Sequence, residues 1–202
     1  MPTNQHAPGR IFLLRHGETE WSASFRHTGR TDVPLTKRGR ELAVAAGQLL
    51  AAMQGSATKT MVYSSPMRRA VDTAQLAGLK PVLDEQLKEW DYGDYEGLTT
   101  DQIRESVPDW RVWSHPSPGG ESAEEVGKRA DEVLARYRGM LTEGNVVLVG
   151  HGHFSRVLTA RWLGLPAKDG LSFRLDAGAL TVLGDERGAP QLEHVNLVPC
   201  RR

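Results

Sequence analysis

The chain has 202 residues, of which 25 are Lys or Arg and 25 are Asp or Glu, so its formal net charge is zero. This balance excludes a protein that binds nucleic acid through a broadly basic surface, and any attraction for anions must come from local clusters of charge. The single cysteine, Cys200, excludes an internal disulfide framework and fits a cytoplasmic location, and no apolar run is long enough to predict a membrane span.

The first predicted elements are a tail, a strand and a helix. Residues 1–9 lack the apolar core of a signal peptide, and we expect a disordered tail followed by one domain over residues 10–202. The apolar run IFLL at 11–14 predicts a strand that is covered on both faces. Residues 36–53 carry an apolar stripe at helical spacing, with Thr36 as the expected N-cap.

Strands and helices continue to alternate after residue 60. MVYSS at 61–65 predicts a second buried strand, which we expect to run into a helix with Pro66 at its first position. A helical stripe covers residues 124–141, VVLVG at 146–150 predicts a third strand, and a further helix should come directly after it. The tail beyond residue 171 contains two strand-like pieces, LSFRL and ALTVL.

This alternation predicts the fold class α/β, with helices on both faces of a mainly parallel sheet in a three-layer α/β/α sandwich. Ligands of such sheets bind beyond the carboxyl ends of the strands. Three predicted strand ends carry Arg or His soon after the apolar run: LLRHGE, YSSPMRRA and LVGHGH. Residues 98–121 are rich in Trp, Pro and Gly, and we expect them to form a small insertion over these strand ends.

If the three strand ends converge, their side chains suit a phosphorylated ligand. Arg15 and either Arg68 or Arg69 would supply forked donors to phosphate oxygens. A histidine such as His16 or His151 can act as the nucleophile when its second ring nitrogen is held by a hydrogen bond. The carboxyl group that protonates the leaving alcohol would come from residues 87–97, which offer Glu89, Asp91, Asp94 and Glu96.

The motifs that contain these residues resemble the signatures of a known family. RHGET at 15–19 is similar to the signature of the histidine phosphatase superfamily, which includes cofactor-dependent phosphoglycerate mutases and many phosphatases. Further resembling segments occur in the family's order between residues 10 and 163: HTGRTDVPLTKRGRELA, SSPMRRAVDTA, LKEWDYGDYEG, GGES and LVGHGHFSRVL. The segments EWS, TGRTD and EWDYGDYEG most resemble the small acid phosphatases and sugar bisphosphatases of this superfamily.

The resemblance implies catalytic roles for five residues. His16 matches the nucleophile that becomes a phosphohistidine, and Arg15 and His151 match phosphate-binding groups. In the second motif the arginine directly before alanine is the match, which selects Arg69 rather than its neighbour. Glu89 matches the general acid that protonates the departing oxygen and then activates water.

The resemblance also implies contacts with the phosphate or the rest of the substrate. The residues at matching positions are Ser22, Arg26, Thr28, Gly29 and His153. Two of them depart from the family: Ser22 replaces a common Asn, and His153 stands where mutases commonly have Asn and many phosphatases Gly. Gly17, after the nucleophile, would permit a phosphate to approach the backbone closely.

Several residues also have an ordinary structural explanation. The spacing of His151 and His153 would suit zinc, but no third ligand is suitably spaced and the resembling family is metal-independent, so we expect no metal. No nucleotide-binding glycine pattern is present, and we expect no cofactor. The other loop carboxylates, Asp91, Asp94 and Glu96, are expected to cap helices or to form hydrogen bonds within the loop. Surface or structural roles are expected for His6, His27, His115 and His194, whereas Trp90, Trp110 and Trp113 either line the pocket or pack the insertion.

The sequence therefore predicts a phosphatase that hydrolyses phosphate monoesters of small metabolites such as sugar phosphates or bisphosphates. The alternative is a phosphoglycerate mutase, but the insertion here carries Arg104 and Arg111 without the Lys and paired Arg of those mutases. A third alternative is a phospho-ligand binding module without turnover. The expected partner is a small phosphorylated metabolite, not nucleic acid or membrane, and a homodimer is kept as a candidate assembly.

Overall fold

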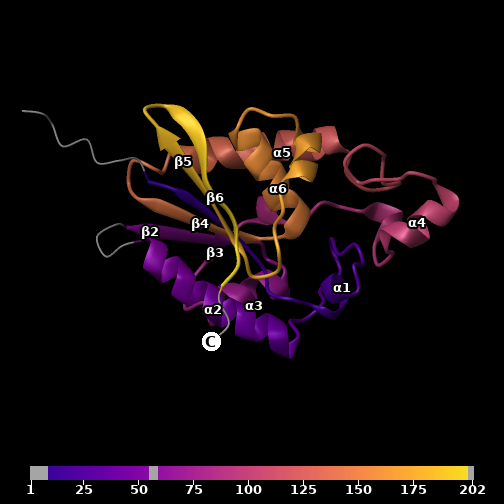
Figure 1. Ribbon diagram of the computed structural model, residues 1–202, viewed down its shortest axis with the longest axis horizontal. Coiled ribbons are helices and arrows are strands. Elements are labelled where there is room, and N and C mark those ends of the chain that lie inside the picture. Colours follow the sequence, from indigo (N-terminus) through magenta and orange to yellow (C-terminus); the bar gives the residue numbers. More distant parts are fainter. Residues whose placement is uncertain (1–8, 55–58, 200–202) are drawn as a thin grey trace, which may run out of the picture.

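A six-stranded sheet forms the centre of the computed structural model, which describes residues 9–54 and 59–199 (Figure 1). Its strand order is β3-β2-β4-β1-β5-β6, and the first four of these strands are parallel to one another. The last two form a hairpin that joins β1 in antiparallel orientation. The strands are β1 (Ile11–Arg15), β2 (Thr60–Ser64), β3 (Val82–Leu83), β4 (Asn145–Gly150), β5 (Leu180–Glu186) and β6 (Ala189–Leu197).

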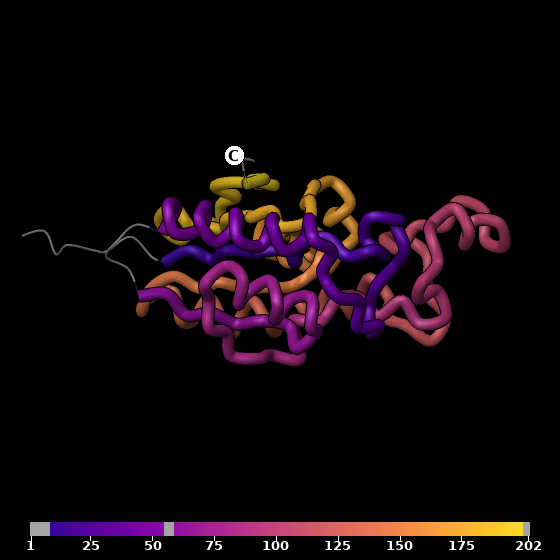
Figure 2. Tube along the Cα trace, turned by 90° about the horizontal axis from the view of Figure 1, so that it is seen from below, coloured from indigo at the N-terminus to yellow at the C-terminus, as the bar shows by residue number. Residues whose placement is uncertain are grey.

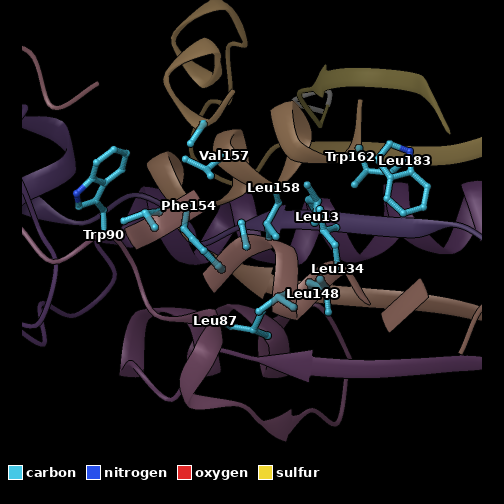
Figure 3. Packing of buried hydrophobic residues seen from close by; sticks show 14 of the residues in the cluster. Leu13, Leu87, Trp90, Leu134, Leu148, Phe154, Val157, Leu158, Trp162 and Leu183 are labelled. Atoms are coloured by element: carbon cyan, nitrogen blue, oxygen red, sulfur yellow. The ribbon is translucent and has the colours of Figure 1, made fainter. Parts of the chain in front are cut away.

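Helices cover both faces of this sheet, which confirms the predicted α/β class. Along β1 the side chains alternate, so that Leu13 packs with α5 and α6 on one face (Figure 3) and Phe12 packs with α2 and α3 on the other. The α-helices are α1 (Glu20–Ala23), α2 (Lys37–Gln54), α3 (Arg68–Leu76), α4 (Thr100–Ser106), α5 (Ala123–Arg138) and α6 (Gly152–Trp162). Three 3₁₀ turns, η1 (Glu85–Leu87), η2 (Gly93–Tyr95) and η3 (Ala167–Ser172), complete the elements.

The structure differs from the sequence-based prediction in three places, the first of which is β2, which is half-buried along most of its length rather than buried. After β2 the helix begins at Arg68 rather than at Pro66, because Met67 has an extended backbone with φ −63° and ψ 132°. The piece LSFRL lies at the end of η3 and in the loop after it, and the carbonyls of Gly170 and Leu171 accept bonds from the Arg156 guanidinium instead of pairing with a strand. The predicted N-cap is confirmed, since Thr36 Oγ1 accepts a 2.9 Å bond from a backbone N–H of α2.

The register of the sheet brings the polar strand ends together. Arg15 pairs with Gly150, and Ser64 pairs with Val149, so β1, β2 and β4 end at the same level. Residues 98–121 extend from the end of the molecule at which α1 also lies, as Figures 1 and 2 show. Their side chains Ile103, Trp110 and Trp113 are buried in the same core cluster as the α6 residues.

Parts of the sequence-based prediction lie outside the described residues. These are Cys200 and residues 1–8 of the expected tail; Gly9 is buried, and its N–H donates to the Leu141 carbonyl. Across the described ranges, no helix combines the length and apolar character needed to traverse a lipid bilayer.

Candidate active site

His16 directly follows β1 and is almost completely buried. Its backbone N–H donates to the Gly150 carbonyl over 2.9 Å, and its ring Nδ1 lies 2.7 Å from the Gly17 carbonyl. A carbonyl can only accept, so Nδ1 carries the ring proton and Nε2 keeps its lone pair. Burial, with help from Arg69 and Arg15, lowers the pKa of His16 well below its ordinary value and favours this neutral form.

His151 lies beside this nucleophile with its ring held on both sides. The two histidine rings meet edge to face, with centroids 5.3 Å apart. Arg69 Nε donates to His151 Nδ1 over 3.2 Å, which places the proton on Nε2, and Nε2 then donates to Ser65 Oγ over 2.8 Å. Burial and the neighbouring Arg69 lower the pKa of His151 well below its ordinary value. The ring is therefore neutral and fixed.

Arg69 is 0% exposed and is bound chiefly by backbone carbonyls. Its two Nη atoms donate to the carbonyls of Thr28, Gly29 and Thr31 at 2.8–3.0 Å. The carboxylate of Glu96 holds this turn from the other side, because it accepts bonds from the N–H groups of Gly29 and Thr31. Arg69 is thus a rigid buried cation behind the two histidines.

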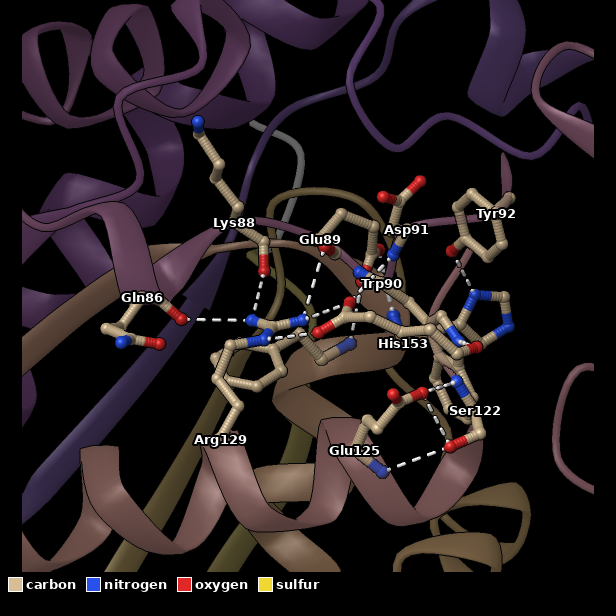
Figure 4. Close-up of polar contacts among 12 residues, drawn as sticks. Gln86, Lys88, Glu89, Trp90, Asp91, Tyr92, Ser122, Glu125, Arg129 and His153 are labelled. Carbon is tan, nitrogen blue, oxygen red and sulfur yellow. Dashed lines mark hydrogen bonds and ion pairs between the residues drawn. The ribbon is translucent and has the colours of Figure 1, made fainter. Parts of the chain in front are cut away.

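The carboxylate of Glu89 lies against the N-terminus of α6 (Figure 4). Oε1 accepts from the N–H groups of Phe154 (2.7 Å) and Trp90 (3.0 Å), whereas Oε2 accepts from the N–H of His153 (3.0 Å). The N–H groups in the first turn of a helix have no acceptor within that helix, and a carboxyl oxygen can accept from them. Oε2 has the fewer bonds, and Glu89 lines the pocket described next.

Arg15, His16 and Glu89 face a common pocket of about 260 Å³. Arg15 Nη1 donates to the Leu175 carbonyl over 2.7 Å, and within the described part of the chain its buried Nε has no acceptor. A buried donor without a partner is costly, so Nε is well suited to an incoming anion. The remaining lining residues are Ser22, Phe25, Arg26, His27, Thr28, Tyr92, Thr100, Gly152, His153, Arg156 and Leu175.

The residues implied as substrate contacts are placed differently from one another. Ser22, Arg26, Thr28 and His153 line the pocket, whereas Gly29 does not. The Ser22 hydroxyl is committed to capping α1, since it donates to the Thr19 carbonyl and accepts from the Thr19 N–H. His153 Nδ1 lies 2.6 Å from the Tyr92 hydroxyl, and Arg26 Nη1 donates to a loop carbonyl over 3.2 Å.

Seven residues of this pocket were missed by the sequence analysis: His27, Arg156, Phe25, Tyr92, Thr100, Gly152 and Leu175. His27, expected to be structural, stacks on His153 with centroids 5.9 Å apart, and its Nε2 lies 3.2 Å from Thr100 Oγ1. Arg156 comes three residues after His153 in α6, and this helical spacing was a usable signal. Phe25 is 83% exposed at the pocket and has φ 58°, a left-handed backbone that a bulky residue rarely adopts.

The structure gives Gly17 a packing role. A Cβ at this position would lie 2.2 Å from the Gly39 carbonyl oxygen, so the glycine permits close packing against the start of α2. Of the two roles expected for Trp90, Trp110 and Trp113, the structure supports packing. All three are buried, and none lines the pocket of His16.

Arg68, the neighbour of Arg69, is exposed and pairs with Asp72. The two histidines considered for zinc have different ring partners, Arg69 and Ser65 for one and Tyr92 for the other. Within residues 9–54 and 59–199 no group of three His, Cys, Asp or Glu side chains could hold a metal ion.

Buried neutral histidines make a testable prediction for stability against pH. Burial lowers the pKa of His16, His27, His151 and His153, in the case of His27 to about 4. Below pH 6.5 these histidines are protonated in the unfolded chain but stay neutral in the folded protein. The free energy of unfolding should therefore fall by about 1.4 kcal/mol per histidine for each unit by which the pH is lowered. For His27 this loss extends down to about pH 4.

Urea unfolding at pH 7.5 and 5.5 measures this effect. We expect a clearly lower midpoint at pH 5.5, and a smaller difference in a His27→Asn variant. Equal midpoints at the two pH values would contradict the prediction.

An α/β sheet that brings together a histidine with a free Nε2, two arginines and a carboxylate beyond its strand ends is typical of enzymes that transfer phosphoryl groups. Comparison with known families specifies the class further. The sequence model of the histidine phosphatase superfamily (branch 1) matches residues 11–198, and the chain belongs to this superfamily.

Similar relatives include several phosphatases. An acid phosphatase of Mycobacterium tuberculosis is 48% identical over 189 residues, covering 93% of this chain and 92% of its own length. Sedoheptulose 1,7-bisphosphatase of Saccharomyces cerevisiae is 34% identical, covering 77% and 68%. A solved Mycobacterium tuberculosis structure superposes with a TM-score of 0.92 at 47% identity, covering 95% of this chain and 99% of that one.

These comparisons identify the chain as a phosphomonoesterase, a hydrolase of the histidine phosphatase type. The prediction of a phosphatase is confirmed, and the mutase alternative is not favoured.

Proposed function

We propose that the chain hydrolyses phosphate monoesters of small phosphorylated metabolites through a phosphohistidine on His16, with Glu89 as general acid and base. One observation carries this proposal: the free Nε2 of His16 faces a pocket that also contains Arg15 and the Glu89 carboxyl group. The phosphate would bind between Arg15 and His16, with its ester oxygen toward Glu89.

The reaction has two displacements at phosphorus. Nε2 of His16 attacks, the N–P bond forms, and the bond from phosphorus to the ester oxygen breaks while protonated Glu89 donates its proton to the departing alcohol. Water then attacks the phosphohistidine and gives a proton to the Glu89 carboxylate. The N–P bond breaks, inorganic phosphate leaves, and both residues return to their initial states.

The surrounding groups support this chemistry by their charge and rigidity. Arg15 offers its unpartnered Nε to the phosphate, and the buried cation Arg69 lies behind the nucleophile. Because burial lowers the pKa of His16, its ring stays unprotonated and nucleophilic in mildly acidic solution. This property agrees with the similarity to an acid phosphatase.

The pocket favours a small anionic substrate. Two further cations, Arg26 and Arg156, line it beside Arg15, whereas Glu89 is its only acidic member among the described residues. This excess of positive charge suits a second negative group, as in a sugar bisphosphate or a phosphoglycerate ester. Relatives named sedoheptulose 1,7-bisphosphatase and glucosyl-3-phosphoglycerate phosphatase support this substrate class.

The remaining expectations belong to the same proposal. Residues 98–121 cover the substrate from one side, where Thr100, at the start of α4, already lines the pocket. Catalysis needs no metal or cofactor, the enzyme acts in the cytoplasm, and a homodimer is its candidate assembly.

A phosphate-release screen over phosphorylated metabolites tests the proposed function. We expect turnover of sugar phosphates and bisphosphates with one equivalent of phosphate per bond broken. Rapid interconversion of 2- and 3-phosphoglycerate without comparable phosphate release would establish a mutase instead. Binding of vanadate without hydrolysis of any ester would establish a module without turnover.

Replacement of Arg26 by glutamine tests the second anionic group. We expect KM for a sugar bisphosphate to rise by about 5-fold, because one charge-assisted hydrogen bond at a partly exposed site is lost. KM for the matching monophosphate should change by less than about 2-fold. Arg30→Gln is the control, since this exposed arginine does not line the pocket. Equal changes for both substrates would contradict a second anion site at Arg26.

A further inference from the structure

We propose that Glu121 and Arg129 are positioning residues for the general acid, which they hold through the main chain on both sides of Glu89. This inference rests on the proposed role of Glu89. Neither residue lines the pocket of His16, and both lie behind the Glu89 segment, where they border a separate pocket of about 160 Å³. Since neither residue lines the substrate pocket, both are positioning residues rather than catalytic ones.

Every N–H of the Arg129 guanidinium has an acceptor in this cluster (Figure 4). Nε and Nη2 bind the two carboxylate oxygens of Glu121, each over 2.8 Å. Nη1 donates to the carbonyls of Gln86 (3.0 Å) and Lys88 (2.8 Å), and Nη2 also donates to the carbonyl of Glu89 itself (3.3 Å). A planar fork with all donors engaged allows little movement of these carbonyls.

Glu121 holds the chain on the other side of Glu89. Its Oε2 accepts the N–H of Asp91 over 2.9 Å, and its own carbonyl accepts the indole N–H of Trp90 over 2.8 Å. The ion pair thus fixes the backbone before and after Glu89 by direct bonds. With the backbone held on both sides, the Glu89 side chain starts from a fixed position.

Arg129 also contacts the group that orients the Glu89 carboxylate. Its guanidinium carbon lies 4.0 Å from the centre of the Phe154 ring, within the range of a cation–π contact. The N–H of Phe154 donates the 2.7 Å bond to Glu89 Oε1. One cation, whose side chain is 14% exposed, therefore touches both the segment that carries the carboxyl group and the helix end that aims it.

This arrangement matters most for esters with poor leaving groups. An alkoxide must receive a proton as it departs, and proton transfer requires the acid within hydrogen-bond distance of the ester oxygen. A p-nitrophenolate ion leaves without protonation. Displacement of Glu89 should therefore slow the hydrolysis of alkyl phosphates but not that of aryl phosphates. A general loss of folded enzyme would slow the hydrolysis of both equally.

The test compares kcat/KM for glycerol phosphate and p-nitrophenyl phosphate in the full-length enzyme. Glu121→Gln keeps the side-chain shape but weakens the ion pair, and Arg129→Lys keeps the charge but loses the fork. We expect each variant to lose about 10- to 100-fold on the alkyl ester and less than about 3-fold on the aryl ester. Glu89→Gln should show the same pattern with a larger loss.

Arg136→Lys is the matched control. Arg136 lies on the same helix, and its Nη1 donates to Asp84 over 2.8 Å, so it binds the preceding loop without contacting Glu89. The Arg136→Lys variant should keep the wild-type ratio of kcat/KM for the two esters. Equal losses on both esters in the Glu121 and Arg129 variants, or none, would overturn the proposal. If the wild-type enzyme hydrolysed neither ester, the proposed function itself would fail.

Discussion

Replacement of His16 by alanine is expected to lower kcat for every phosphate ester by at least about 10⁴-fold, the scale typical of a lost nucleophile. The loss should not depend on the leaving group, because without Nε2 no phosphoenzyme forms. The covalent intermediate can be detected directly. Enzyme mixed with a ³²P-labelled ester and stopped in alkaline detergent should carry label, since a phosphohistidine survives alkali but not acid.

His194→Ala is the matched control, because His194 is exposed on β6, two strands away from β1, and does not line the pocket of His16. This variant should keep both label and turnover. Label that persists in His16→Ala would show that another residue is the nucleophile. An unlabelled wild type under conditions of slow turnover would exclude the phosphohistidine mechanism.

The sequence predicted the central part of this site because its signals are local. A short apolar run that ends in Arg15 and His16 defines both a buried strand and the cationic group and nucleophile at its carboxyl end. The parallel register then brings Ser65 and His151 to the same sheet edge without any further information. Position within a motif, not periodicity, separated Arg69 from Arg68.

The rest of the pocket depends on loops whose course no spacing rule specifies. His27 enters the pocket because residues 26–31 turn around Glu96, and Phe25 reaches its mouth through a left-handed backbone. Both features depend on tertiary contacts. The role of Arg129 was hidden for the same reason: its partners are carbonyls 40 to 43 residues earlier, and a charged residue on an amphipathic helix normally faces solvent.

Replacement of Arg69 by methionine should have the largest effect on stability, combined with a loss of activity. The side chain is fully buried, and its removal leaves the carbonyls of Thr28, Gly29 and Thr31 without their donor. Buried acceptors without partners cost about 1 to 3 kcal/mol each, whereas removal of a desolvated cation returns part of that cost. We expect the free energy of unfolding to fall by about 3 to 5 kcal/mol.

For a chain of this length that loss corresponds to a melting temperature lower by about 10 °C. Activity should fall by at least about 10³-fold even well below the melting temperature, because His151 loses the donor that fixes its ring and the phosphate loses a nearby cation. Arg68→Met is the matched control: this exposed neighbour removes the same charge at the adjacent position and should change the melting temperature by less than about 2 °C. Equal shifts in the two variants would show that the carbonyl cage around Arg69 does not stabilise the fold, and they would contradict the network of Glu96, Arg69 and His151 as the rigid support of the nucleophile.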